Sequence, residues 1–123
     1  MVIRIGSVIL SLAGVFALIL GLLLWSHRAP QMVSLHMLLG LLVVCALWVI
    51  GIAQAFAPNG SWLMAACAII VGALVLVLGM IQASLMVGEF HWVIQVIHLL
   101  LGLTAIGIGH VVAARYRRGQ PQP

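Results

Sequence analysis

Two histidines recur at matching places in this chain, and their type and spacing could carry chemistry. His36 begins the run His-Met-Leu-Leu-Gly-Leu and His98 begins His-Leu-Leu-Leu-Gly-Leu, so Gly40 or Gly102 follows each at i+4. His36 and His98 are 62 positions apart, as are the two glycines. Each histidine lies in a long apolar segment, where an imidazole is costly and by default indicates a functional site. The natural partner of each is therefore the other.

The composition indicates an integral membrane protein. The chain has 123 residues, 66% of them hydrophobic and 5% charged, and Glu89 is its one acidic residue. Four apolar segments, at about residues 2–25, 32–56, 62–87 and 92–116, are each long enough to cross a hydrocarbon layer ~30 Å thick. We expect one all-α domain over residues 1–116, a four-transmembrane-helix up-down-up-down bundle, followed by a disordered polar tail over 117–123.

Small residues repeat in the first and third segments as the histidines do in the second and fourth. Gly14 and Gly21 correspond to Gly72 and Gly79, 58 positions later. In both segments the small and polar residues recur at steps of three and four, which places them on one helix face that packs against protein. The pattern predicts that the bundle is a duplicated two-helix hairpin.

The arginines predict the orientation of the bundle. One end carries four of them, Arg4, Arg115, Arg117 and Arg118, and the other end carries only Arg28. Because basic residues are enriched on the cytoplasmic side, we expect an inner (cytoplasmic) membrane protein with both termini in the cytoplasm. These charges are accounted for as topology signals, so they do not indicate a nucleic-acid partner. The recurring histidines then lie at equal depth, a little over one turn in from the outer side.

Two inward imidazoles at equal depth could bind one metal ion from opposite sides. The second and fourth helices run parallel and face each other across the diagonal of such a bundle. This is how two axial ligands hold the iron of a low-spin b-type haem. We therefore expect one haem b per chain, with His36 and His98 as its ligands.

Two further groups of residues would serve such a ring. Glycines let a flat macrocycle approach the backbone closely, and they lie one turn deeper than each ligand and at comparable depth on the other two helices: Gly40, Gly102, Gly21 and Gly79. Donors near the outer end would bind the propionate carboxylates of the ring. The candidates there are Arg28, His27, His91 and Gln95, with the indoles of Trp25 and Trp92.

A packing role is the alternative for the same histidines. A histidine inside a bundle can bond a serine or a carbonyl, and paired glycines are usual at membrane helix interfaces. The protein would then be a non-redox accessory subunit or assembly factor. Zinc or copper fits less well, because two imidazoles leave a zinc site short of ligands. His110 has Trp48 as its counterpart in the first half, so a second axial pair is not expected.

On these residues the chain resembles the small transmembrane b-type cytochromes, and in particular one four-helix half of haem A synthase. In that family paired histidines on the second and fourth helices hold a haem, and the matching positions here are His36 and His98. The resemblance implies electron transfer, and we expect exchange between a membrane quinol and a partner redox protein. It does not extend to synthase activity, because the acidic residue of the catalytic half has no counterpart in these helices and Glu89 lies in a loop.

Overall fold

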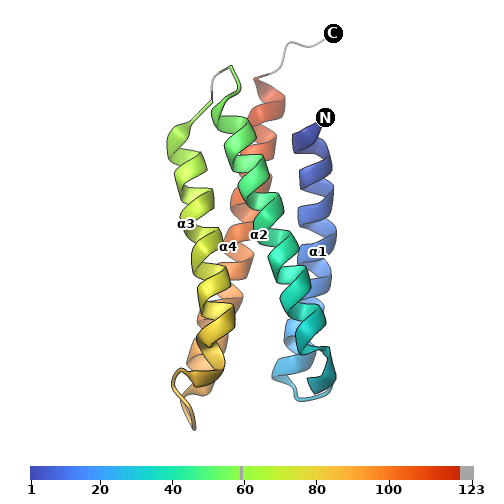
Figure 1. Ribbon diagram of the computed structural model, residues 1–123, viewed down its shortest axis with the longest axis vertical. Helices are drawn as coiled ribbons and strands as arrows, with labels where there is room; N and C mark the ends of the chain where they lie inside the picture. The colour runs from blue at the N-terminus through green and yellow to red at the C-terminus, as the bar shows by residue number, and fades with distance from the viewer. Residues whose placement is uncertain (59, 120–123) are drawn as a thin grey trace.

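The protein consists of four long α-helices in the computed structural model, which describes residues 1–58 and 60–119 (Figure 1). The helices are α1 (Val2–Trp25), α2 (Val33–Ala55), α3 (Trp62–Ile81) and α4 (His91–Arg118). Two short 3-10 helices accompany them, η1 (Pro30–Met32) before α2 and η2 (Gln82–Ser84) after α3. No strand occurs in the described ranges, and the predicted all-α class is confirmed.

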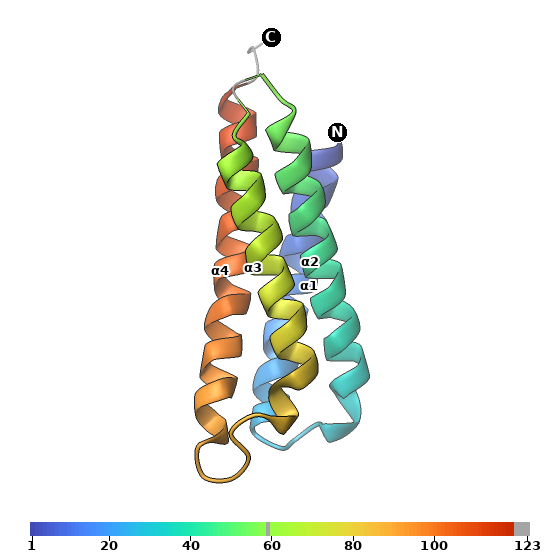
Figure 2. The ribbon, with the colours of Figure 1, turned by 60° about the vertical axis from the view of Figure 1, so that its left-hand side comes forward.

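The helices run alternately up and down in a single bundle (Figures 1 and 2). The N-terminus, the end of α4 and the α2–α3 turn lie at one end, and the α1–α2 and α3–α4 connections lie at the other. α2 packs against α1, α3 and α4, whereas α1 and α3 do not approach each other. The second and fourth helices therefore meet across the diagonal, as the sequence predicted.

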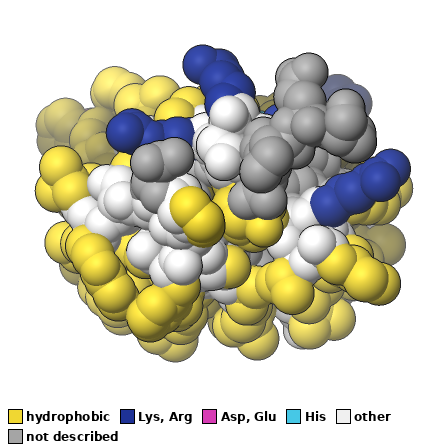
Figure 3. All heavy atoms as spheres, turned by 90° about the horizontal axis from the view of Figure 1, so that it is seen from above, with side chains coloured by type: hydrophobic (Ala, Val, Ile, Leu, Met, Phe, Trp, Pro, Cys, Tyr) yellow, Lys and Arg dark blue, Asp and Glu magenta, His cyan; other side chains and the backbone are white. Residues whose placement is uncertain are grey.

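All four helices are long and apolar enough to cross a membrane, by length and composition. Their outward faces carry large apolar side chains that are about half exposed, such as Leu12, Phe16 and Leu100. A soluble protein seldom exposes so continuous an apolar surface, so these faces contact the lipid bilayer. Figure 3 looks onto the end that carries both termini, where Arg side chains stand above a hydrophobic surround.

Equivalent contacts join α1 to α4 and α3 to α2. A Cβ added to Gly14 would lie 2.8 Å from Cδ1 of Ile106, and one added to Gly72 would lie 3.0 Å from Cγ1 of Val44. Gly14 and Gly72 are separated by the offset of 58, and Val44 and Ile106 by the offset of 62 that relates the histidines. The same close approach of helices thus occurs twice, as a duplicated hairpin predicts.

A second pair of equivalent contacts lies nearer the termini. Trp48 Nε1 donates to the carbonyl oxygen of Ile69 at 3.2 Å, joining α2 to α3. At the equivalent place His110 Nε2 lies 3.4 Å from Oγ of Ser11, joining α4 to α1. Trp48 and His110 therefore serve the same purpose, which is to connect neighbouring helices.

The packed core lies in the half of the bundle nearest the termini. Its largest fully buried apolar side chains are Leu10 of α1, Val44, Leu47 and Ile50 of α2, and Val112 of α4, and Ala68 of α3 is equally buried. The histidines of the repeat lie in the other half, nearer the α1–α2 and α3–α4 connections. The buried core that holds the helices together is therefore concentrated in one half of the bundle, and the histidines lie in the less tightly packed half.

Two helix boundaries differ from the prediction. α3 ends at Ile81 and not at residue 87, because η2 and the positive φ angles of Met86 (48°) and Gly88 (106°) turn the chain away from the helix. α4 continues to Arg118, so Arg117 and Arg118 are helical and do not belong to a tail. Basic side chains in a last helical turn interact favourably with the helix dipole. The remainder of the expected tail, from residue 120, lies outside the described residues.

Candidate functional site

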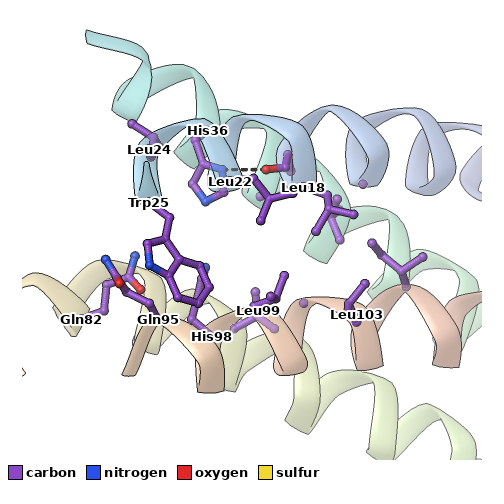
Figure 4. Close-up of a pocket in the computed structure, with 18 residues that line it drawn as sticks. Leu18, Leu22, Leu24, Trp25, His36, Gln82, Gln95, His98, Leu99 and Leu103 are labelled. Carbon is purple, nitrogen blue, oxygen red and sulfur yellow. Dashed lines mark hydrogen bonds between the residues drawn. The ribbon is translucent and has the colours of Figure 1, made fainter. Parts of the chain in front are cut away.

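A cavity opens between the helices in the half of the bundle away from the termini (Figure 4). Its empty space is about 880 Å³ when the open mouth is included, and about 160 Å³ of it can hold the centres of water molecules. Small-molecule sites occupy roughly 300–1,000 Å³, which is more than the smaller of these two volumes, so a large ligand would extend through the open side of the cavity. Leu22 of α1 and Leu103 of α4 line the cavity and are also 50% and 45% exposed, so it opens sideways towards the lipid beside these two helices.

His36 and His98 face each other across this cavity. His36 comes from α2 and His98 from α4, and both line its wall (Figure 4). The centroids of the two imidazole rings are 6.2 Å apart and the ring planes make an angle of 62°. The structure thus brings together the two residues that the sequence singled out, at the same level of the bundle.

The orientation of the His36 ring is set by α1. Nδ1 of His36 lies 3.0 Å from the carbonyl oxygen of Ala17. A carbonyl oxygen only accepts, so Nδ1 carries the proton of the neutral ring and Nε2 keeps a free lone pair. Histidines that bind metals commonly use one nitrogen in this way to fix the ring while the other binds the metal. The carbonyl of Ala17 has no signature in the sequence, and the sequence analysis did not identify it.

The His98 ring has one nitrogen without a partner. Its Nδ1 is buried, and no hydrogen bond reaches it within the described parts of the chain. An unsatisfied buried polar atom costs about 1–3 kcal/mol. Because this nitrogen is buried, a group in the cavity could reach it only after a rotation of the ring.

Four glycines surround the two rings in two different ways. A Cβ on Gly21 would lie 3.2 Å from Cε1 of His36, and a Cβ on Gly79 would lie 3.2 Å from Cε1 of His98. Each imidazole therefore rests against a glycine of the neighbouring helix, α1 or α3. Gly40 and Gly102 line the cavity itself, and a Cβ on either would have no neighbour within 4 Å. Of the four predicted glycines, Gly21 and Gly79 therefore contact the imidazole rings and serve as their seats, whereas Gly40 and Gly102 form part of the cavity wall.

The polar residues at the mouth differ from those expected. Gln95 lines the cavity as predicted, but Arg28 and His91 are not among its lining residues. Arg28 is exposed beyond the end of α1, and Nδ1 of His91 donates to the carbonyl oxygen of Leu85 at 3.1 Å. The expectation that these two side chains stand at the carboxylates of a bound ring is not met by this arrangement, because one extends into solvent and the other bonds to its own loop.

One lining residue, Gln82, was not assigned to the site from the sequence. Gln82 of η2 lies near Gln95, and Trp25 stands beside them at the end of α1 (Figure 4). Gln82 was expected within a continuous third helix and was given no role in the site, whereas the indole of Trp25 was expected near the carboxylates of the ring, a role that stays a prediction. The spacing along the helix could have identified Gln82, because it follows Gly79 by three positions, much as Trp25 follows Gly21 by four.

The side chains that could bind a metal at this cavity decide between a bare metal ion and a metal held in a tetrapyrrole. The described residues contain no cluster of three or more His, Cys, Asp or Glu side chains that could hold a bare metal ion. A tetrapyrrole needs only two protein ligands, because its ring supplies the other donors. Metal–imidazole bonds of about 2.0 Å, with ring nitrogens about 1.1 Å from the centroid, put two imidazoles on opposite sides of one metal at a centroid separation of about 6.2 Å. The observed 6.2 Å agrees with this value, so the separation of the two rings is compatible with a haem, although direct contacts between aromatic rings span roughly the same distances.

No protein family model, no curated protein and no solved structure matches this chain.

Proposed function

We propose that this protein is a membrane b-type cytochrome that holds one haem b between His36 and His98 and transfers electrons. The observation that supports this most directly is the 6.2 Å separation of two imidazoles that face each other across a cavity. The haem would supply one-electron oxidation and reduction of its iron. This function agrees with the resemblance to one half of haem A synthase, which itself stays a hypothesis.

The residues around the cavity have separate tasks in this proposal. His36 and His98 would hold the haem as its two protein ligands, which would disfavour binding of oxygen or a substrate at the metal and favour outer-sphere electron transfer. The carbonyl of Ala17 holds the His36 ring in place. The apolar walls, such as Val43 and Val75, exclude water and help to set the redox potential.

The setting of the site suggests partners and an orientation. The sideways opening beside Leu22 and Leu103 favours a lipid-soluble electron donor such as a quinol, with a partner redox protein as acceptor. By the positive-inside rule, the Arg-rich end seen in Figure 3 would face the cytoplasm and place both termini there. The cavity would then lie towards the outer face of the inner membrane.

One observation favours the second candidate, a non-redox accessory subunit or assembly factor. The bond from His36 to the carbonyl of Ala17 joins α2 to α1 and would by itself account for that histidine as a packing residue. A packing role explains His98 less well than His36, because no hydrogen bond found among the described residues holds the His98 ring to a neighbouring helix.

The test is the visible spectrum of the detergent-purified protein after expression with ample haem. We expect a Soret band and sharp α and β bands on reduction, with about one haem per chain. His36→Ala and His98→Ala each lose this spectrum. His110→Ala is the matched control, because His110 is an exposed histidine of α4 that does not line the cavity, and it keeps the spectrum. A colourless wild-type protein, or full haem content in both axial variants, would contradict the proposal.

A further inference from the structure

Three polar side chains lie together at one end of the cavity. Gln82 comes from η2, Gln95 from α4 and Trp25 from the end of α1, and Figure 4 shows the two amides close to each other beside the indole. The hydrogen bonds found among described residues use none of these three side chains. Their donors are therefore free to bind a ligand that reaches this end.

All three stand one helical turn outward from the level of the axial histidines. Gln95 precedes His98 by three positions in α4, which is about 4.5 Å along a helix. Gln82 follows Gly79, the seat of the His98 ring, by three positions. In the same way Trp25 follows Gly21, the seat of the His36 ring, by four positions. The edge of a flat ring centred between the histidines would reach this level.

The opposite end of the cavity has no such donors. Its lining residues there are apolar, and they include Gly14, Val43 and Ile106 next to the packed core. A carboxylate at that end would be an unpaired charge among apolar side chains, which is very costly. The two ends of the cavity therefore differ enough to fix the direction of a ring that carries carboxylates on one edge.

We infer that Gln82, Gln95 and Trp25 bind the two carboxylates of the haem, so that the ring lies with its propionate edge towards the α1–α2 and α3–α4 connections. This inference rests on the proposed function. It keeps Gln95 and Trp25, which the sequence already indicated, and adds Gln82 in place of Arg28 and His91, which do not line the cavity. The amide N–H groups and the indole N–H donate, and the carboxylate oxygens accept. Recognition is by neutral donors, since no Lys or Arg lines this cavity among the described residues.

The test compares two ligands that differ only in these carboxylates. Haem-free protein in detergent is titrated with iron protoporphyrin IX and with its dimethyl ester, which has no carboxylate. Hydrogen bonds to charged groups make us expect the wild type to bind the free acid roughly tenfold more tightly than the ester. Gln82→Leu and Gln95→Leu bind the free acid less well and the ester unchanged, so that the preference disappears.

Two further variants make the comparison sharper. Gln95→Glu places a carboxylate beside those of the ring, so it weakens binding of the free acid far more than binding of the ester. Gln31→Leu is the control, because Gln31 is an exposed glutamine near the same end that does not line the cavity, and it keeps the wild-type preference.

The outcomes separate this inference from the proposed function. If the wild type binds neither ligand, the cytochrome proposal fails and this inference fails with it. If the wild type binds both ligands with the axial-histidine spectrum but the glutamine variants keep its preference, only this inference is overturned. An equal loss of both ligands in the glutamine variants would also overturn it, because the glutamines would then act on the fold and not on the carboxylates.

Discussion

Gly40 and Gly102 line the cavity from opposite helices, and a side chain on either would enter free space. A Cβ at these positions would have no neighbour within 4 Å, whereas a Cβ on Gly14 or Gly72 would come within 3.0 Å of another helix or closer. Glycine is thus required at Gly14 and Gly72 for close packing of helices. At Gly40 and Gly102 the packing of the helices does not require glycine, and because both line the cavity, the open space there is available to a ligand.

The first prediction follows from this difference. Gly40→Leu and Gly102→Leu fill the cavity, so haem content falls to near zero while the haem-free protein remains folded. Its stability stays equal or rises by about 1 kcal/mol, because leucine favours a helix more than glycine does. The measurements are Soret absorbance per protein and thermal unfolding without haem.

Gly107→Leu is the control for this filling experiment. Gly107 lies on α4 like Gly102, has no neighbour within 4 Å of a Cβ, and is exposed outside the cavity. The variant is expected to keep its haem. Full haem content in Gly102→Leu would place the haem elsewhere, and unfolding of both Gly102→Leu and Gly107→Leu would mean that leucine harms α4 wherever it stands.

The bundle and the histidine pair could be predicted from the sequence because both depend on periodic patterns. Apolar length gives the helices, and equal offsets in duplicated segments give equal depth, so His36 and His98 were placed correctly at the same level. The position of a residue along the bundle axis can be predicted well, because it follows from the number of residues that separate it from the end of its helix.

The direction of side chains near helix ends could not be predicted in the same way. His91 has the depth of the cavity mouth, yet its ring bonds to Leu85 O, because the loop before it folds back. Gln82 lines the cavity because α3 ends just before it, at Ile81. The end of α3 in turn depends on the positive φ angles in the loop that follows. The carbonyl of Ala17 has no signal at all, since every residue carries one.

The second prediction concerns the seats of the two rings. Gly21→Ala and Gly79→Ala each add a methyl group 3.2 Å from a Cε1 atom, which pushes the imidazole towards the centre of the cavity. Overpacking of this kind costs about 1–3 kcal/mol, so haem affinity is expected to fall roughly 5- to 150-fold in each variant. Haem titration measures the affinity, and electron paramagnetic resonance reports the changed ligand angle. A normal haem affinity and spectrum in both variants would show that glycine at these two positions is not needed to place the imidazole rings.

The third prediction distinguishes the two histidines in the absence of haem. His98→Leu removes the unpartnered Nδ1, so the haem-free protein gains about 1–3 kcal/mol. His36→Leu loses the bond to Ala17, so it is expected to lose about 0.5–1.5 kcal/mol. Reversible unfolding in mixed micelles gives both values. If both variants lose stability equally, the histidines are equivalent packing residues, as the accessory-subunit alternative requires.

The fourth prediction follows from the uneven packing of the bundle. The half nearest the termini holds the buried core of Leu10, Leu47 and Val112, and the other half surrounds the cavity. Without haem, amides at residues 33–42 and 95–104 should therefore exchange with deuterium faster than those at 44–50 and 105–113. Haem at 100 times its Kd stabilises the folded state by about 2.7 kcal/mol, so exchange in the cavity half should slow by up to about 100-fold. His98→Ala should show the fast pattern with or without haem in the medium. Slowing that is uniform along all four helices, or that persists in His98→Ala, would mean that haem binds to the apolar surface and not between the histidines.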